Sequence, residues 1–351
     1  MTRRQALKMA AISALLAGAV ACTASKPTVT VDPSRLQAFK VLPAVMDSAA
    51  NPITDDKVDL GRMLYYDARL SKGQDVSCNT CHALTKYGVD DESESVSTGH
   101  KGQKGTRNSP TVYNAAGHFV QFWDGRAATI EEQAGGPMLN PVEMAMPDAK
   151  HVVAVLKSMP EYVAAFGKAF PGEKDPVTYD NAGKAIGAFE RKLVTAARWD
   201  KFLAGDQAAL NDAEKAGLNK FLDTGCQMCH SGAYMGGSMF QKLGAVQPWP
   251  QTADQGRFEV TKQDADKMVF KVPSLRNIEK TAPYYHDGSV KTLDDAVAKM
   301  AQYQLGKPLG KEDVDSVVTF LKTLTGELPA AYIKQPELPK STPKTPPPDK
   351  G

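Results

Sequence analysis

Two five-residue motifs carry the residue types best suited to chemistry. They read CNTCH at residues 78–82 and CQMCH at residues 226–230, and both have the pattern C-x-x-C-H. Two thiols three positions apart can each bond one vinyl group of a haem, and the adjacent histidine then lies under the iron as its ligand. The sequence therefore predicts two covalent haem c groups, bound by Cys78, Cys81, His82, Cys226, Cys229 and His230.

Two other uses of cysteine pairs fit this sequence less well. A redox-active pair, or a zinc site shared by both pairs, would not explain why a histidine directly follows each pair. Zinc would also favour ligands closer together than two motifs that lie 148 residues apart. Bacteria attach haem c outside the inner membrane, so an export signal is expected with these motifs.

The first 21 residues have the pattern of such a signal. Their start is basic, residues 10–20 are almost wholly apolar, and the small residues at 19–21 suit cleavage. The pair Arg3-Arg4 also fits a twin-arginine signal. Cys22 follows the cleavage site and is either the lipidated cysteine of a lipoprotein or an incidental residue. We expect a periplasmic protein, attached to the membrane only if Cys22 is lipidated.

Length and composition indicate a globular protein of two domains. The chain has 351 residues, of which 42% are hydrophobic and 23% charged, and this argues against a disordered, collagen-like or multi-span membrane protein. The formal net charge is +2, but residues 1–21 hold three basic and no acidic residues, which leaves 39 basic against 40 acidic residues in the remainder. No basic field suggests a nucleic-acid partner. One cysteine lies outside the motifs, so no disulfide framework is expected.

The elements that must position the motifs are mainly α-helices. Capping residues precede apolar residues at spacings of three and four, and strand alternation is scarce. The predicted helix starts are Thr54, Asp148, Thr178, Asn211 and Thr292, and another helix carries Val314 to Leu324. The expected fold is mainly α, with two cytochrome-c-like haem domains in tandem.

The expected boundaries follow from the motifs and from proline content. From Pro336 onward proline is so frequent that extended, solvated chain is favoured. The prediction is a signal peptide at 1–21, a linker or N-terminal segment at 22–42, an N-terminal haem domain at 43–192, a C-terminal haem domain at 193–328 and a proline-rich disordered tail at 329–351.

Each iron needs a sixth ligand or an open position, and this choice separates electron transfer from catalysis. Methionine raises the reduction potential, and the second motif is followed by Met235, Met239, Met268 and Met300. The first two are too near the motif to reach the opposite haem face easily. Met300 lies 70 residues beyond His230 in a predicted helix, so it is the preferred candidate, with core packing as the alternative.

The histidine candidates for the first haem are His100, His118 and His151. His100 lies in the loop GHKGQKG, where three glycines allow movement. It could bind iron and later leave, or be an exposed loop histidine.

Polar and aromatic residues are dense between residues 121 and 146. Cleaving the O–O bond of a peroxide requires a group that moves a proton from one oxygen to the other. Glu143 and Gln133 are candidates for acid–base and hydrogen-bonding roles, and Trp123 is an amphipathic aromatic residue. A carboxylate such as Glu143 near an open haem face would serve this chemistry.

Several ordered blocks between about Pro43 and Thr325 together resemble the bacterial dihaem cytochrome c peroxidase family. They read DLGRMLYYDARLS, CNTCH, GHKGQKGTRNSPTVYNA, FWDGRA, EEQAGGP, NPVEM, CQMCH, VPSLRNIEKTAPYYHDG and LDDAVAKMAQYQLG. The resemblance covers most of the chain after the signal and is far more specific than the two haem motifs alone. The tail and Cys22 are outside this pattern.

The resemblance implies a different role for each haem. The haem on His82 would be the low-potential peroxidatic haem, with His100 as a ligand that leaves on activation. The haem on His230 would be the high-potential haem that accepts electrons, with Met300 as its sixth ligand.

The resemblance also implies roles for residues around the haems. Gln133 and Glu143 would belong to the peroxide pocket, and Trp123 would lie between the haems. Further matching positions are Asn108, Thr281 and Pro283 at a calcium ion between the haems, the last two through backbone carbonyls, and His286 near the haem and domain contacts.

The implied activity is reduction of hydrogen peroxide to water. The electrons would come from a small periplasmic cytochrome c or cupredoxin, and a homodimer is implied. One alternative is a dihaem electron carrier without peroxidase activity. Another is the dihaem relative that builds a tryptophylquinone cofactor, which uses tyrosine where this sequence has Met300, although Tyr303 is nearby.

Overall fold

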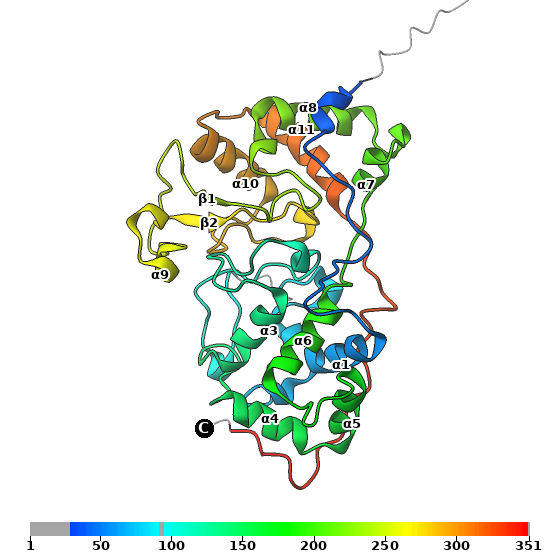
Figure 1. The fold of residues 1–351 in the computed structure, drawn as a ribbon. Helices are drawn as coiled ribbons and strands as arrows, with labels where there is room; N and C mark the ends of the chain where they lie inside the picture. Colours follow the sequence, from blue (N-terminus) through cyan, green and yellow to red (C-terminus); the bar gives the residue numbers. More distant parts are fainter. Residues whose placement is uncertain (1–28, 91–94, 350–351) are drawn as a thin grey trace, which may run out of the picture.

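The computed structural model describes residues 29–90 and 95–349, and within these ranges the protein is mainly helical, as predicted (Figure 1). The export signal and Cys22 lie outside the described residues. The longer helices are α1 Asp55–Tyr66, α3 Ile130–Leu139, α4 Ala149–Lys157, α5 Pro160–Ala169, α6 Tyr179–Glu190, α8 Asp212–Thr224 and α11 Lys311–Leu321. The shorter ones are α2 Cys78–Cys81, α7 Arg198–Leu203, α9 Phe258–Thr261 and α10 Leu293–Lys299.

The remaining regular structure is small. Strands β1 Phe240–Lys242 and β2 Val269–Lys271 pair antiparallel, and a π-helical segment, Met300–Gln304, continues α10. Of the helices in the described ranges, none is long and apolar enough to cross a membrane.

The helix starts follow from local side-chain chemistry. Thr54, Asp148 and Thr178 each accept a hydrogen bond from a backbone N–H in the first turn of α1, α4 and α6. Asn211 and Glu214 form a reciprocal capping box at α8. These bonds satisfy N–H groups that have no partner inside the helix, so the predicted starts are confirmed.

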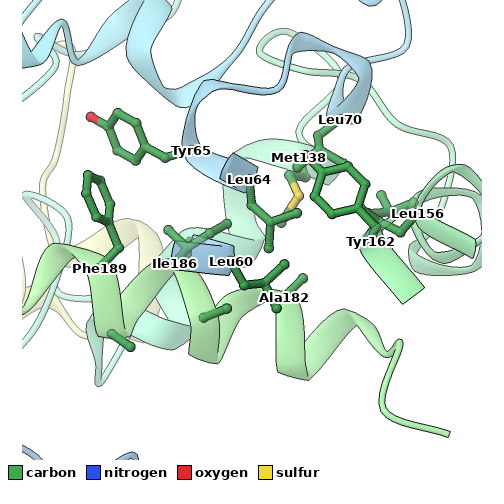
Figure 2. Close-up of a cluster of buried hydrophobic side chains, with 14 of the residues drawn as sticks. Leu60, Leu64, Tyr65, Leu70, Met138, Leu156, Tyr162, Ala182, Ile186 and Phe189 are labelled. Carbon is green, nitrogen blue, oxygen red and sulfur yellow. The ribbon is translucent and has the colours of Figure 1, made fainter. Parts of the chain in front are cut away.

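The first of the two large hydrophobic cores in the described residues joins α1 and α3 to α6 in the lower half of Figure 1. Figure 2 shows Leu60 and Leu64 of α1 beside Ala182 and Ile186 of α6. The two helices approach closely at Gly61, where a Cβ would overlap the backbone carbonyl of Ala185. Each buried leucine contributes about 1.5–3 kcal/mol relative to an exposed one.

The second core lies in the upper half of Figure 1 and joins α7, α8, α10 and α11. Trp199, Phe221 and Phe320 form its centre, and Trp199 and Phe221 each lie 5.3 Å from Phe320 between ring centroids. The chain passes from the first core to the second between Leu193 and Ala197.

The N-terminal segment differs from the predicted linker. Phe39 is 6% exposed and packs edge-on against Trp199 of the second core at 5.4 Å. The backbone N–H of Gly232 donates to Ala38, and that of Leu42 donates to Asp200. Residues 29–42 therefore belong to the C-terminal unit, although they precede the N-terminal one in the chain.

The prediction of a disordered tail was wrong for residues 329–349. Ile333 is 5% exposed in the first core, and the ring of Tyr332 stacks on Phe189 at 5.1 Å. Further along, Asp349 forms an ion pair with Lys72. Proline keeps this segment extended, but its apolar and hydrogen-bonding side chains attach it to the N-terminal unit. In Figure 1 it runs down the side of that unit to the C-terminus.

Candidate active site and haem-binding sites

The first haem motif lies on the one-turn helix α2. Ser77 and Thr80 cap this helix reciprocally. The Nδ1 atom of His82 lies 3.3 Å from the carbonyl oxygen of Gly88, and burial lowers the pKa of this imidazole. A neutral imidazole whose Nδ1 is held by a carbonyl presents its Nε2 to a metal.

The second motif directly follows the C-terminus of α8 at Gly225. The Nδ1 atom of His230 lies 3.2 Å from the carbonyl oxygen of Met235, and burial lowers the pKa of His230 to about 4. The side chains of Cys226, Cys229 and His230 line a largely apolar cavity of about 230 Å³. The two motifs thus share the same arrangement of the axial histidine.

Both alternatives for the cysteine pairs fit the structure poorly. Across the described parts of the chain, no group of three or more His, Cys, Asp or Glu side chains is arranged to hold a metal ion. Burial raises the pKa of the Cys226 thiol to about 12 and that of Cys81 to about 11. A redox-active pair requires a thiol with a lowered pKa. Two cysteines followed directly by a histidine instead suit covalent haem attachment.

Met300 lines the same cavity as His230. It is the first residue of the π-helical segment, a kind of local distortion that is frequent at functional sites. Tyr303 of the same segment instead packs edge-on against Trp249 at 5.2 Å. Met235 and Met268 are buried among the side chains of hydrophobic clusters. Of the four methionines considered, Met300 is the one that lines this cavity.

His100 and Glu143 meet in one loop cluster. His100 is 6% exposed, and its backbone N–H donates to the carbonyl oxygen of Glu143 at 2.8 Å. Gly99 permits this approach, since a Cβ there would overlap the Val142 carbonyl. The interpretation of His100 as an exposed loop residue is therefore wrong.

Glu143 also lies near the first haem motif. Burial raises the pKa of its carboxyl group, and this effect is partly offset by the charge of Arg126 and by a 2.8 Å hydrogen bond from Asn140. The pKa of Cys81 is raised first by burial and also by the charges of Asp90 and Glu143. The carboxyl group is therefore within electrostatic reach of a haem-binding cysteine.

Gln133 lies on α3, one helical turn before Pro137. The carbonyl oxygen of Pro137 accepts a hydrogen bond from Met144, next to Glu143. Gln133 is half-buried, and within the described ranges no hydrogen bond joins its side chain to Glu143. The structure brings the two residues to neighbouring segments but not into direct contact.

Trp123 and Asn108 connect the two units. The indole Nε1 of Trp123 donates to the carbonyl oxygen of Asn108 at 2.9 Å. The Asn108 side chain reaches the carbonyl oxygen of Pro283 at 2.6 Å, and its backbone N–H donates to His286 at 2.8 Å. These residues and Thr281 all line the cavity of the second haem motif. His286 itself stacks on Phe270, with ring centroids 4.3 Å apart.

Comparison with known proteins agrees with this geometry. Residues 55–208 match the family described as di-haem cytochrome c peroxidase. The chain is 46% identical over 302 residues to the cytochrome c551 peroxidase of Nitrosomonas europaea, covering 85% of this chain and 88% of the relative. It is 45% identical over 316 residues to the cytochrome c551 peroxidase of Pseudomonas aeruginosa, covering 88% and 90%. The chain belongs to the di-haem cytochrome c peroxidase family.

This membership defines the cofactor and the enzyme class. The di-haem peroxidase carries two haem c groups and is an oxidoreductase of the cytochrome-c peroxidase class. Its fold is also similar to a crystal structure of a MauG-like protein associated with microbial copper homeostasis, with a TM-score of 0.72, 28% identity, and coverage of 85% of this chain and 96% of that one.

One of the buried cations lies beside the second haem motif, and no sequence pattern indicates it. Lys271 is 6% exposed and lines the cavity of the second haem motif. The segment Val269 to Pro273 reads VFKVP, and the alternating position of the lysine would ordinarily place it in solvent. Its burial depends on contacts with His118 and Val120, 150 residues earlier in the chain, which no local pattern reveals.

Proposed function

We propose that this peroxidase reduces hydrogen peroxide to two waters with two electrons and two protons. The electrons come from a small periplasmic cytochrome c or cupredoxin, arrive at the haem on His230 and are used at the haem on His82. The observation that carries this proposal is the hydrogen bond of 2.8 Å from the backbone N–H of His100 to the carbonyl oxygen of Glu143, a half-buried glutamate whose charge also acts on Cys81.

The residues present fit the two haems. Each site offers two free thiols and a neutral histidine held by a backbone carbonyl. When bound, the haems supply the electron carriers and an iron position that can open. Met300 would complete the second site, and a thioether ligand keeps a haem at high potential, as an electron acceptor requires.

Glu143 would act as the acid–base group. Its raised pKa brings its change of protonation closer to neutral pH than that of an exposed glutamate. Such a group takes a proton from one peroxide oxygen and returns it to the other. The Gln133 amide, on the helix that supports the Glu143 loop, would orient the substrate through hydrogen bonds.

His100 would close the first iron site in the resting enzyme. Its loop contains Lys101 and Gly102 in left-handed conformations, with φ values of 57° and 71°. Such a turn is a local feature that can rearrange without unfolding either core. Reduction of the haem on His230 would release His100, and Trp123 would lie on the route between the haems.

A calcium ion would join the two units at Asn108. Calcium prefers hard oxygen ligands, including amide and backbone carbonyls. Asn108 already faces the carbonyl oxygen of Pro283, and the opposite orientation of the same amide would present Oδ1 to a cation. The carbonyl of Thr281 would complete the protein ligands.

The two alternative functions are a dihaem electron carrier and a tryptophylquinone-forming enzyme, and one structural feature weighs against each. A pure electron carrier would leave the buried Glu143 carboxyl without a role. The second alternative is the tryptophylquinone-forming activity that the resemblance of the sequence implies. That activity would require a tyrosine ligand, and here Tyr303 packs on Trp249 while Met300 lines the cavity.

Our proposal also includes the location and the oligomeric state of the enzyme. We place the enzyme in the periplasm as a homodimer, anchored in the membrane only if Cys22 is lipidated. The predicted signal at residues 1–21 supports export.

Peroxide turnover by the half-reduced holoenzyme tests the function. We expect turnover with a small cytochrome c as donor, and a loss of about 10²–10⁴-fold in Glu143→Gln, as is typical for a missing acid–base group. Glu161→Gln changes an exposed glutamate on α5 and serves as the matched control. A half-reduced enzyme that remains six-coordinate and inert would instead identify an electron carrier.

A further inference from the structure

Strand β2 of the C-terminal unit ends in the buried Lys271, whose side chain points toward the N-terminal unit. The backbone N–H of Lys271 donates to the carbonyl oxygen of Trp123 at 2.8 Å. Its Nζ atom donates to the carbonyl oxygen of Val120 at 3.2 Å and lies 3.4 Å from Nδ1 of His118. The ammonium group therefore lies against the N-terminal unit, and Lys271 is also among the residues that line the cavity of the second haem motif.

This ammonium group has no carboxylate of its own in the described parts of the protein. The carboxylate whose charge acts on it is Asp124. Asp124, however, already accepts from Arg107 at 2.6 Å and from Arg126 at 2.9 Å. Arg107 also pairs with Asp254 at 2.6 Å. The carboxylates Asp124 and Asp254 therefore face the three cations Arg107, Arg126 and Lys271, and one positive charge is left in excess.

The group nearest to Lys271 cannot supply the missing negative charge. Burial, and then the charge of Lys271, hold the pKa of His118 well below its usual value, so this histidine is neutral at pH 7. Burial also lowers the pKa of Lys271 itself to about 8. A buried charge without a partner costs several kcal/mol. The site therefore favours an anion.

The cavity on which Lys271 opens is the one lined by Cys226, Cys229 and His230, and most of its lining is apolar. A haem attached there brings two propionate carboxylates into it. We propose that Lys271 binds a propionate of the haem held by Cys226 and Cys229, with His118 and Val120 fixing the position of the ammonium group. The carboxylate site depends only on haem attachment, whereas its role in electron acceptance rests on the proposed function.

A cation at this position would tune the second haem. A positive charge near an iron centre stabilises the reduced state, and pairing with a propionate removes a negative charge that would stabilise the oxidised state. Lys271 would therefore raise the reduction potential of the haem on His230. A Met300 ligand would raise the same potential, and a high potential suits an electron acceptor. Because the backbone of Lys271 also bonds to Trp123, the same residue ties this haem to the inter-unit contact.

A redox titration of the holoenzyme, followed by the absorption of each haem, tests this inference. In Lys271→Met, which keeps the length of the side chain, we expect a lower potential for the haem on His230 at pH 8. We also expect a new dependence of that potential on pH near neutrality, because the unpaired propionate would then take up a proton. Lys271→Arg should restore most of the wild-type behaviour.

Lys242→Met is the matched control, since Lys242 borders the same cavity but is solvent-exposed. Its charge is screened by water, so its loss should leave the potential nearly unchanged. The inference is overturned if Lys271→Met and Lys242→Met give the same potential and pH dependence, or if the haem on His82 shifts instead. Peroxide turnover with a chemical reductant, measured separately, would show whether the proposed function holds in either case.

Discussion

The backbone N–H of His100 donates to the carbonyl oxygen of Glu143 at 2.8 Å. The proposed removable ligand and the proposed acid–base group are therefore joined by a direct hydrogen bond between their loops. Displacement of His100 must either break this bond or move the Glu143 segment with it. Opening of the iron site and placement of the carboxyl group would thus be one event.

Substitution of His100 tests this coupling. We expect His100→Gly to convert the resting first haem from six-coordinate to five-coordinate and to remove any need for prior reduction. Absorption and electron paramagnetic resonance spectra of the oxidised protein provide the measurement. His151→Ala, which changes a half-buried histidine in the first turn of α4, should resemble the wild type. An unchanged resting spectrum in His100→Gly would show that His100 is not the ligand.

The pH dependence of turnover should report the Glu143 carboxyl group. Its pKa lies above the ordinary value because it is buried. The group must be ionised to accept a proton from peroxide, so turnover should fall as the pH drops through this raised pKa. The acidic limb should lie above pH 4.5, the usual range for glutamate. Turnover would be measured over a series of pH values at saturating donor. The wild type should show the acidic decrease, and the residual turnover of Glu143→Gln should not.

Removal of calcium should act through Asn108. We expect a chelator to lower peroxide turnover in the wild type, because the contact between Asn108 and Pro283 joins the two units. Asn108→Ala should be equally impaired without chelator and should respond no further to it. Asn219→Ala removes an exposed amide bonded to Thr30 and serves as the control. Equal sensitivity of Asn108→Ala and wild type to chelator would place the ion elsewhere.

The C-terminal segment should stabilise the N-terminal unit through Tyr332. Its ring stacks on Phe189, and its hydroxyl donates to the Phe189 carbonyl at 2.7 Å. Tyr332→Ala should lower the free energy of unfolding by about 2–4 kcal/mol, whereas Tyr332→Phe, which keeps the ring, should cost about 1 kcal/mol. Denaturant titration measures both. Equal stability of all three proteins would mean that the segment is not attached in solution.

Local chemistry explains what the sequence could predict. Thr54 and Asn211 cap their helices through atoms at most three residues away, so a short stretch of sequence contains the whole interaction. The haem motifs are equally local. Resemblance to a family, rather than any pattern in this chain, supplied the proposed calcium-binding role of Asn108 and the assignment of Gln133 to the peroxide pocket.

Interactions between distant residues explain what the sequence could not predict. The proline content of residues 329–349 correctly indicates extended chain, but the attachment depends on Tyr332 meeting Phe189 on the far side of the fold. Burial of Lys271 likewise depends on His118 and Val120. Composition and periodicity describe one segment at a time, so neither can identify a contacting residue that is distant in the sequence.

Each end of the described chain packs in the core of the opposite unit, and this affects the order in which the two units can fold. Phe39 belongs to the C-terminal core and Ile333 to the N-terminal one. Because a chain is synthesised from its N-terminus, the N-terminal unit cannot complete its core until nearly the last residues of the chain have been made. Haem attachment to Cys78 and Cys81 can thus begin on an unfinished unit, which the arrival of Ile333 then closes.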